Sequence, residues 1–171
     1  MTGPLHGERV TLRDIEEGDA AALRSSHRTP EVSKWWKLPS DEFPFEGDER
    51  DNQLTIERDG QVVGLIQFME ETEPDYRHAA IDIFVDPAHH RQGVASDAIT
   101  TLVRHLTEER GHHRITIDPA VANVAAVRCY ERVGFQSVGV LRESWRDADG
   151  VWRDCLFMEL IVRKPARPGP G

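Results

Sequence analysis

The feature that most constrains the fold is a buried strand followed by a glycine turn and a long amphipathic helix. Residues 79–85 are apolar except for one aspartate, which is typical of a strand covered on both faces. From Gly93 to Arg110 apolar residues recur at helical spacing, and Gly111 ends the pattern. A strand that leads into a helix packed on its own sheet is the repeating unit of α/β folds. The sequence therefore predicts a central strand, a tight turn and a helix.

Patterns on either side extend this unit to a whole sheet. Alternating residues predict a strand at 8–14, and Asp59-Gly60 and Asp149-Gly150 are turn dipeptides that predict two hairpins. Asp19 and Pro30 are suited to begin two short helical segments, the second carrying a Trp pair. Further strands are predicted at 54–58, 62–68, 114–117, 135–141 and 151–162, and further helices at 20–27 and 124–133. We expect an α/β (α+β) fold with a central mixed sheet of about six to seven strands flanked by helices.

Length and composition indicate one globular domain. The chain has 171 residues, of which 39% are hydrophobic and 30% charged, enough for a single core and typical of a folded protein. We expect residues 1–163 to form this domain and the proline-containing segment 164–171 to be a disordered tail. Residues 37–51 lack any period and predict a long surface loop.

Charge and cysteine content restrict the partners. The net charge is −9, which argues against nucleic acid and favours a cationic partner. No apolar run reaches the roughly 18 residues of a membrane span and no signal pattern opens the chain, so we expect a cytoplasmic protein with no membrane partner. Cys129 and Cys155 are expected to be buried thiols in a reducing compartment. A monomer and a homodimer both remain open.

The turn at 90–96 has the composition of a phosphate site. Gly93 and the small Ala95 let a ligand approach the backbone, and the amides that begin the helix favour an anion. Arg91 adds a charged donor. Taken alone, Gly93 is better explained by a tight strand-to-helix turn without any ligand.

Two motifs together resemble the GNAT superfamily of N-acetyltransferases. His90-Arg-Gln-Gly-Val-Ala95 resembles its Gln/Arg-x-x-Gly-x-Gly/Ala motif, although His90 departs from the first position, and residues 123–135 resemble its Asn-x-x-Ala-x-x-x-Tyr-x-x-x-Gly-Phe signature. The resemblance covers about residues 79–135 and implies an acetyl-CoA-dependent transferase. It also implies that the pantetheine arm pairs with the backbone of a central strand opened by a β-bulge. The donor-binding residues implied are Phe84, Val85, Arg91, Gln92, Gly93, Val94, Ala95, Ser96, Asn123 and Ala126.

Asn123 and Tyr130 share one face of their helix. They are seven positions apart, which is an angular difference of only about 20°. A phenol beside a thioester sulfur can protonate the leaving thiolate, and the resemblance assigns Tyr130 that role. A tyrosine that only packs in the core is the alternative.

Two aspartates are candidates for binding and activating an amine. Asp82 interrupts the apolar strand 79–85, where an unpaired charge is costly, and Asp118 closes the strand 114–117. With Trp35 and Trp36, they resemble the aminoglycoside 6′-N-acetyltransferase branch. That resemblance implies Asp118 as the base and Asp82 as an amine contact. Because flat aromatic faces stack on sugar rings and cations, we expect the two Trp rings to be pocket walls, and a core position for one of them is the alternative. A salt bridge for Asp82 and an Asx turn for Asp118 remain alternatives.

The overall hypothesis is direct acetyl transfer from acetyl-CoA to a small cationic amine, such as an aminoglycoside-like sugar. A protein N-terminal or lysine acetyltransferase of the ribosomal-protein type is one alternative, and a non-catalytic acyl-CoA-binding module is another. The pairs His89-His90 and His112-His113 lack metal-ligand spacing, so no metal is predicted.

Overall fold

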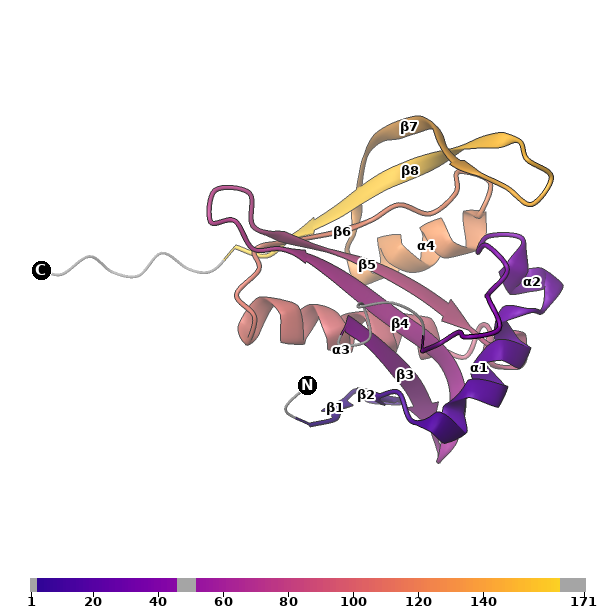
Figure 1. Ribbon diagram of the computed structural model, residues 1–171. Coiled ribbons are helices and arrows are strands. Elements are labelled where there is room, and N and C mark those ends of the chain that lie inside the picture. The colour runs from indigo at the N-terminus through magenta and orange to yellow at the C-terminus, as the bar shows by residue number, and fades with distance from the viewer. Residues whose placement is uncertain (1–2, 46–51, 164–171) are drawn as a thin grey trace, which may run out of the picture.

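The computed structural model describes residues 3–45 and 52–163, which form one mixed sheet with helices on both of its faces (Figure 1). The predicted tail 164–171 and residues 46–51 of the predicted loop lie outside the described residues. Along the chain the elements are β1 (Leu5–His6), β2 (Thr11–Asp14), the 3-10 turn η1 (Glu17–Asp19), α1 (Ala20–His27), α2 (Pro30–Ser33), β3 (Gln53–Arg58), β4 (Gln61–Glu71), β5 (His78–Val85), the 3-10 turn η3 (Pro87–His89), α3 (Val94–Glu108), β6 (Arg114–Ile117), α4 (Val124–Val133), β7 (Gln136–Arg146) and β8 (Trp152–Ile161).

The sheet has eight strands in the order β1-β2-β3-β4-β5-β6-β8-β7, which is slightly more than the six to seven predicted. The additional strand is β1, which precedes the predicted strand 8–14: residues 7–10 form a turn, so the predicted strand is shortened to β2 and pairs back on β1. The Asp97 carboxylate holds this turn by accepting the amides of Glu8, Arg9 and Val10 at 3.1, 2.7 and 3.0 Å. Such a contact across about ninety positions of sequence leaves no local pattern.

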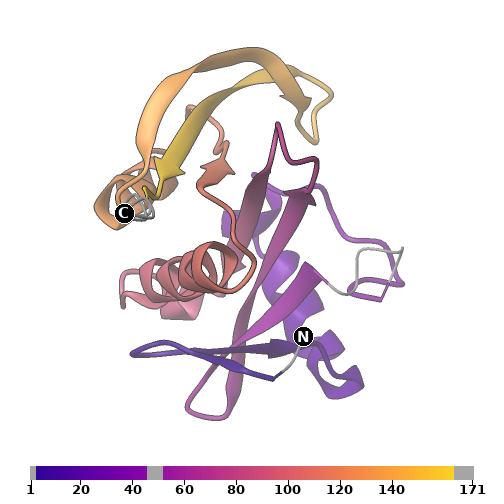
Figure 2. The same cartoon turned by 90° about the vertical axis from the view of Figure 1, so that its left-hand side faces the viewer.

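Each face of the sheet has its own core. On one face α3 and α4 cover a large cluster that includes Leu54, Ile66 and Ile81. On the other face α1 and α2 cover a smaller cluster built on Leu65 and Phe84. Figure 2 shows the two helix pairs on opposite sides of the strands. Because side chains alternate along a strand, this division also assigns the polar residues to a face.

No bulge interrupts the pairing of β4 with β5. Their pairing runs without interruption from Glu71–His78 to Gly64–Val85, whereas the resemblance implied a bulge in the central strand. The register shift lies instead between β3 and β4, where Val63 is the additional residue. β5 pairs with its parallel neighbour β6 only through Ala79 and Ala80. The sheet therefore opens because β6 diverges, and residues 81–85 border the opening.

The helices begin and end largely where glycine and proline predict. Gly93 precedes α3 at φ 80° and Pro30 begins α2, but Trp35 and Trp36 follow α2 instead of belonging to it. Asp19 does precede α1, yet its carboxylate accepts from Arg13, Thr55 and the Glu16 amide and caps no α1 amide.

The two cysteines differ in burial, and the described helices are too short or too polar to span a membrane. Cys155 is buried and Cys129 is only half-buried, and both are free thiols. Among the helices of residues 3–45 and 52–163, none has the length and apolar character needed to cross a bilayer.

We expect Gly64→Ala to destabilise the protein. A Cβ at this position would lie 2.3 Å from the Phe84 carbonyl oxygen, so the two central strands would have to shift. Forced overpacking of this kind costs about 1–3 kcal/mol, which thermal unfolding would detect as a lower melting temperature. The matched control is Gly139→Ala in β7, where no atom lies within 4 Å of the added carbon. Equal melting temperatures for the two variants would contradict the prediction.

Candidate active site

The opening beside β5 exposes backbone groups of alternate residues. The Asp86 amide donates to the Val63 carbonyl at 2.8 Å. By the alternation of an antiparallel ladder, the backbone of Phe84 then bonds β4, and that of Ile83 and Val85 faces the opening. Phe84 contributes mainly its ring, which is buried in the smaller core. Val85 is therefore the predicted strand residue whose backbone is directed toward a ligand in the opening.

The turn before α3 is held by its own side chains. The His90 Nε2 lies 2.8 Å from the Val85 carbonyl, and since a carbonyl only accepts, this nitrogen donates. The Gln92 side chain donates to the Ala88 carbonyl at 2.9 Å and accepts from Arg58 at 2.8 Å. Arg91 has φ 58°, which raises the backbone cost of this turn. The contacts of His90 and Gln92 thus fix the turn without using the first backbone amides of α3.

The first residues of α3 offer backbone instead of side chains. Val94 is buried and Ala95 packs against the larger core. The Ser96 hydroxyl lies 3.3 Å from the Cys129 Sγ of α4. Gly93 has no side chain, and the Arg9 guanidinium lies next to it. Amides at a helix N-terminus are suited to bind phosphate oxygens.

Asn123 and Tyr130 both belong to α4, but in different roles. The Asn123 side chain accepts from the Ala126 amide at 3.3 Å and so caps the helix. Tyr130 is buried, with its ring 6.3 Å from that of Phe135. Burial, followed by the nearby Cys129, Asp82 and Asp118, raises the pKa of the Tyr130 phenol. The phenol therefore keeps its proton at neutral pH.

Asp82 of β5 lies on the face of the sheet opposite α3, because its neighbours Ile81 and Ile83 belong to the larger core, and Asp118 directly follows β6 on the other side of the opening. Burial raises the pKa of Asp82, against a hydrogen bond from Gln67. Burial and the charge of Asp82 raise the pKa of Asp118. Because both carboxylates also act on the Tyr130 phenol, the structure brings together three residues that are far apart in sequence.

The aromatic residues separate into two environments. Trp36 packs edge-on against Phe84 and His27, with ring centroids 5.2 and 5.6 Å apart, close to the face that carries Asp82. Trp35 instead lies under the Lys34 ammonium, 4.8 Å from the ring centroid. Sequence reasoning missed His27, which is buried among these rings and whose pKa burial lowers. A single His in a short helix carried no signal of this position.

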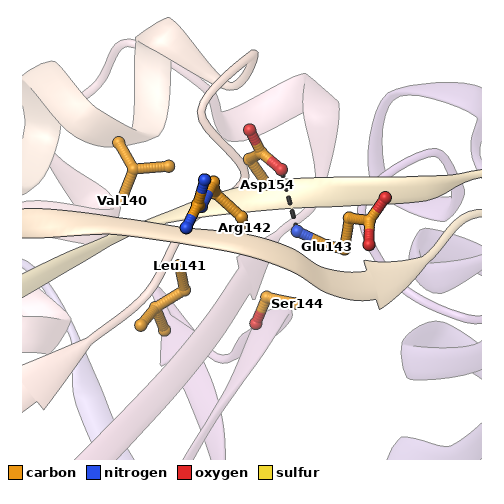
Figure 3. Close-up of a pocket in the computed structure, with 6 residues that line it drawn as sticks. All are labelled: Val140, Leu141, Arg142, Glu143, Ser144 and Asp154. Atoms are coloured by element: carbon orange, nitrogen blue, oxygen red, sulfur yellow. Dashed lines mark hydrogen bonds between the residues drawn. The ribbon is translucent and has the colours of Figure 1, made fainter.

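A hollow with a volume of about 910 Å³ lies at the edge of the sheet, along β7 (Figure 3). The pairing of β7 with β8 shifts between Leu141 and Trp145, which leaves the edge strand bent here. Leu141 and Ser144 point to one side of β7. Ser144 hydrogen-bonds Cys155, whose pKa is raised by burial and by Asp118. The residues that line the hollow are Val140, Leu141, Arg142, Glu143, Ser144 and Asp154.

Comparison with known proteins identifies the family. The family model described as "Acetyltransferase (GNAT) family" matches residues 11–135. A spermidine N(1)-acetyltransferase of Vibrio cholerae is 26% identical, with 91% of this chain and 95% of that protein covered. An aminoglycoside N(6′)-acetyltransferase type 1 of Klebsiella pneumoniae is 25% identical over 78% and 77% of the two chains.

A solved structure has the same fold. The Vibrio cholerae spermidine N-acetyltransferase in complex with CoA and spermine superposes with a TM-score of 0.72, at 24% identity, and covers 90% of this chain and 95% of that one. No group of three or more His, Cys, Asp or Glu side chains within residues 3–45 and 52–163 is arranged to hold a metal ion.

We expect Asp82→Asn to stabilise the protein at about pH 8. A carboxyl with a folded pKa above its ordinary 3.8 binds more protons when folded, so its contribution to stability falls as the pH rises through the folded pKa. The melting temperature of the variant should exceed that of the wild type at about pH 8, and the two should converge below the ordinary pKa.

Asp19→Asn is a control with the opposite sign. Burial tends to raise the pKa of Asp19, but Arg13, the Glu16 amide and Thr55 hold it below its ordinary value. Its stabilising contribution is therefore present above pH 3.8 and lost as the pH falls through the lower folded pKa. This variant should melt below the wild type at about pH 8. A wild type more stable than Asp82→Asn at that pH would contradict the prediction.

Proposed function

This chain belongs to the GNAT acetyltransferase family and is an acetyl-CoA-dependent N-acetyltransferase, and from that premise we propose that its acceptor is a primary amine of a small polycation. The observation that carries the proposal is the convergence of Asp82, Asp118 and Tyr130 at the opening between β5 and β6. The two carboxylates attract a cationic acceptor, and the Tyr130 phenol of α4 protonates the leaving thiolate.

The proposed acetyl-CoA site begins at the N-terminus of α3 and continues along β5. The α3 amides bind the pyrophosphate, with Arg91 as a charged donor, and the pantetheine arm runs along the Val85 backbone. The amides come from Gln92, Gly93, Val94, Ala95 and Ser96. Asn123 and Ala126, at the first turn of α4, border the arm on its other side. The Phe84 ring, buried in the smaller core, anchors the part of β5 along which the pantetheine arm runs.

The proposed chemistry is direct transfer. Asp82 binds the acceptor's ammonium, and Asp118 accepts a proton from it, for which a raised pKa is favourable. The freed amine nitrogen attacks the thioester carbonyl, the C–N bond forms and the C–S bond breaks. Tyr130 donates its proton to the departing thiolate, and the resulting phenolate takes up the second proton, which the acylated nitrogen must lose to become the amide. The raised pKa of Tyr130 keeps the phenol protonated before the reaction and makes its phenolate a good proton acceptor.

The aromatic wall supports a sugar-like or otherwise extended acceptor. Trp36 packs edge-on against Phe84, on the face that carries Asp82, and flat rings pack well on sugar rings and on cations. Relatives of this chain include proteins named for spermidine and for aminoglycosides, both of which carry several amino groups. An aminoglycoside-like aminated sugar is our first candidate and a linear polyamine our second. A protein N-terminus or lysine is the alternative class.

We expect Tyr130→Phe to lower kcat by about a hundredfold or more, the usual contribution of a positioned acid, while the KM for acetyl-CoA stays nearly unchanged. Steady-state thiol release measures both constants. A non-catalytic acyl-CoA-binding module would instead show the same, negligible turnover in wild type and variant.

An acceptor panel tests the substrate class. Thiol release with kanamycin, spermidine, hexylamine and a lysine peptide should give a kcat/KM for at least one of the first two about tenfold above the others, because paired carboxylates favour a second positive charge. A clear preference for the peptide would support the protein acetyltransferase alternative and contradict our proposal.

A further inference from the structure

Three polar side chains form a row across the strands that lead to the opening. Gln53 of β3 is paired in register with Gln67 of β4, and Gln67 with Asp82 of β5. All three lie on the face opposite α3, because their neighbours along each strand belong to the larger core. Directly opposed residues on adjacent strands are close enough for their side chains to bond.

The hydrogen bonds in this row have one direction. Gln53 Nε2 donates to Gln67 Oε1 at 3.3 Å, and Gln67 Nε2 donates to Asp82 Oδ2 at 3.5 Å. An ionised carboxylate only accepts, so the Gln67 amide group must face Asp82, which leaves its oxygen for Gln53. Bonds aligned in this way polarise one another. Both donors are thus turned toward Asp82.

Among the described residues, Gln67 gives the one interaction that stabilises the charged form of Asp82. The side chains that face it electrostatically are Asp118 beyond β6, Tyr130 of α4 and Cys155 of β8, none of which is a cation. The Gln67 hydrogen bond is the contribution that favours its charged form against burial. Without that bond, a half-buried carboxylate beside a second carboxylate would tend to take up a proton.

We infer that Gln67, held by Gln53, is a positioning residue that keeps the Asp82 carboxylate ionised and oriented to bind the acceptor's ammonium. The inference rests on the proposed function of Asp82. Gln67 touches neither donor nor acceptor in this role. It acts through Asp82, and Gln53 acts in turn through Gln67.

The first test compares kinetics with pH. Relative to wild type, Gln67→Leu should raise the KM for the amine by about three- to tenfold, the usual range for a lost hydrogen bond. The acid limb of kcat/KM should move to higher pH, because the pKa of Asp82 rises further. The KM for acetyl-CoA should not change. Gln61→Leu is the matched control, since Gln61 begins the same strand and is exposed.

A double-mutant cycle tests the order of the row. Gln53→Leu alone should shift the amine KM in the same direction by a smaller factor. In the Gln67→Leu background it should have no further effect, since its only route to Asp82 is gone. Additive effects of the two substitutions would overturn the proposed order.

A measurement without turnover separates this inference from the proposed function. In protein labelled with ¹³C-aspartate, the Asp82 carboxyl signal, assigned by its loss in Asp82→Asn, should titrate at a higher pH in Gln67→Leu than in wild type. An unchanged titration would overturn the inference even if amines are acetylated. A shifted titration in a protein that acetylates none of the amines would uphold the effect on Asp82 and overturn its proposed use.

Discussion

The divergence of β6 from β5 is the constraint on which the rest of the site depends. Two parallel strands that pair only at Ala79 and Ala80 leave the following backbone of β5 without a strand partner on that side. Buried backbone groups need a hydrogen-bonding partner, so the gap is a place where an extended ligand is stabilised. The same divergence moves Asp118 away from a regular ladder position and allows Tyr130 to approach from the opposite face. The proposed donor, acceptor and acid can therefore meet inside the sheet.

Much of this architecture could be predicted because its signals are local. The apolar strand, Gly93 and the periodic helix lie within thirty or so residues and predicted β5, the turn and α3 correctly. The additional strand β1 could not be predicted, since the turn that creates it is held by Asp97 from a distant helix. The bulge at Val63 also depends on how two strands pair. Register is a property of the assembled sheet, and a strand pattern alone does not specify it.

The same distinction applies to the candidate site. Asp82 was conspicuous because a charge in an apolar strand is costly, and Tyr130 because of its motif. Gln53 and Gln67 looked like ordinary polar residues of half-exposed strands, and the role we infer for them depends on the register that places Gln67 beside Asp82 and Gln53 beside Gln67. Trp35 and Trp36 show the limit in another way. Adjacent residues point in different directions, and only Trp36 packs against Phe84.

The carboxylates at the opening oppose folding and favour binding. Burial raises the pKa of both Asp82 and Asp118, and the charge of Asp82 raises that of Asp118 further, so the charged carboxylates lower the stability of the empty protein. The cationic acceptor that we propose offsets this cost when it binds, because its positive charge stabilises the charged carboxylates. A single neutral donor, Gln67, suits this arrangement better than an arginine would. A permanent cation would neutralise Asp82 in the absence of substrate and compete with the ammonium for the same oxygens.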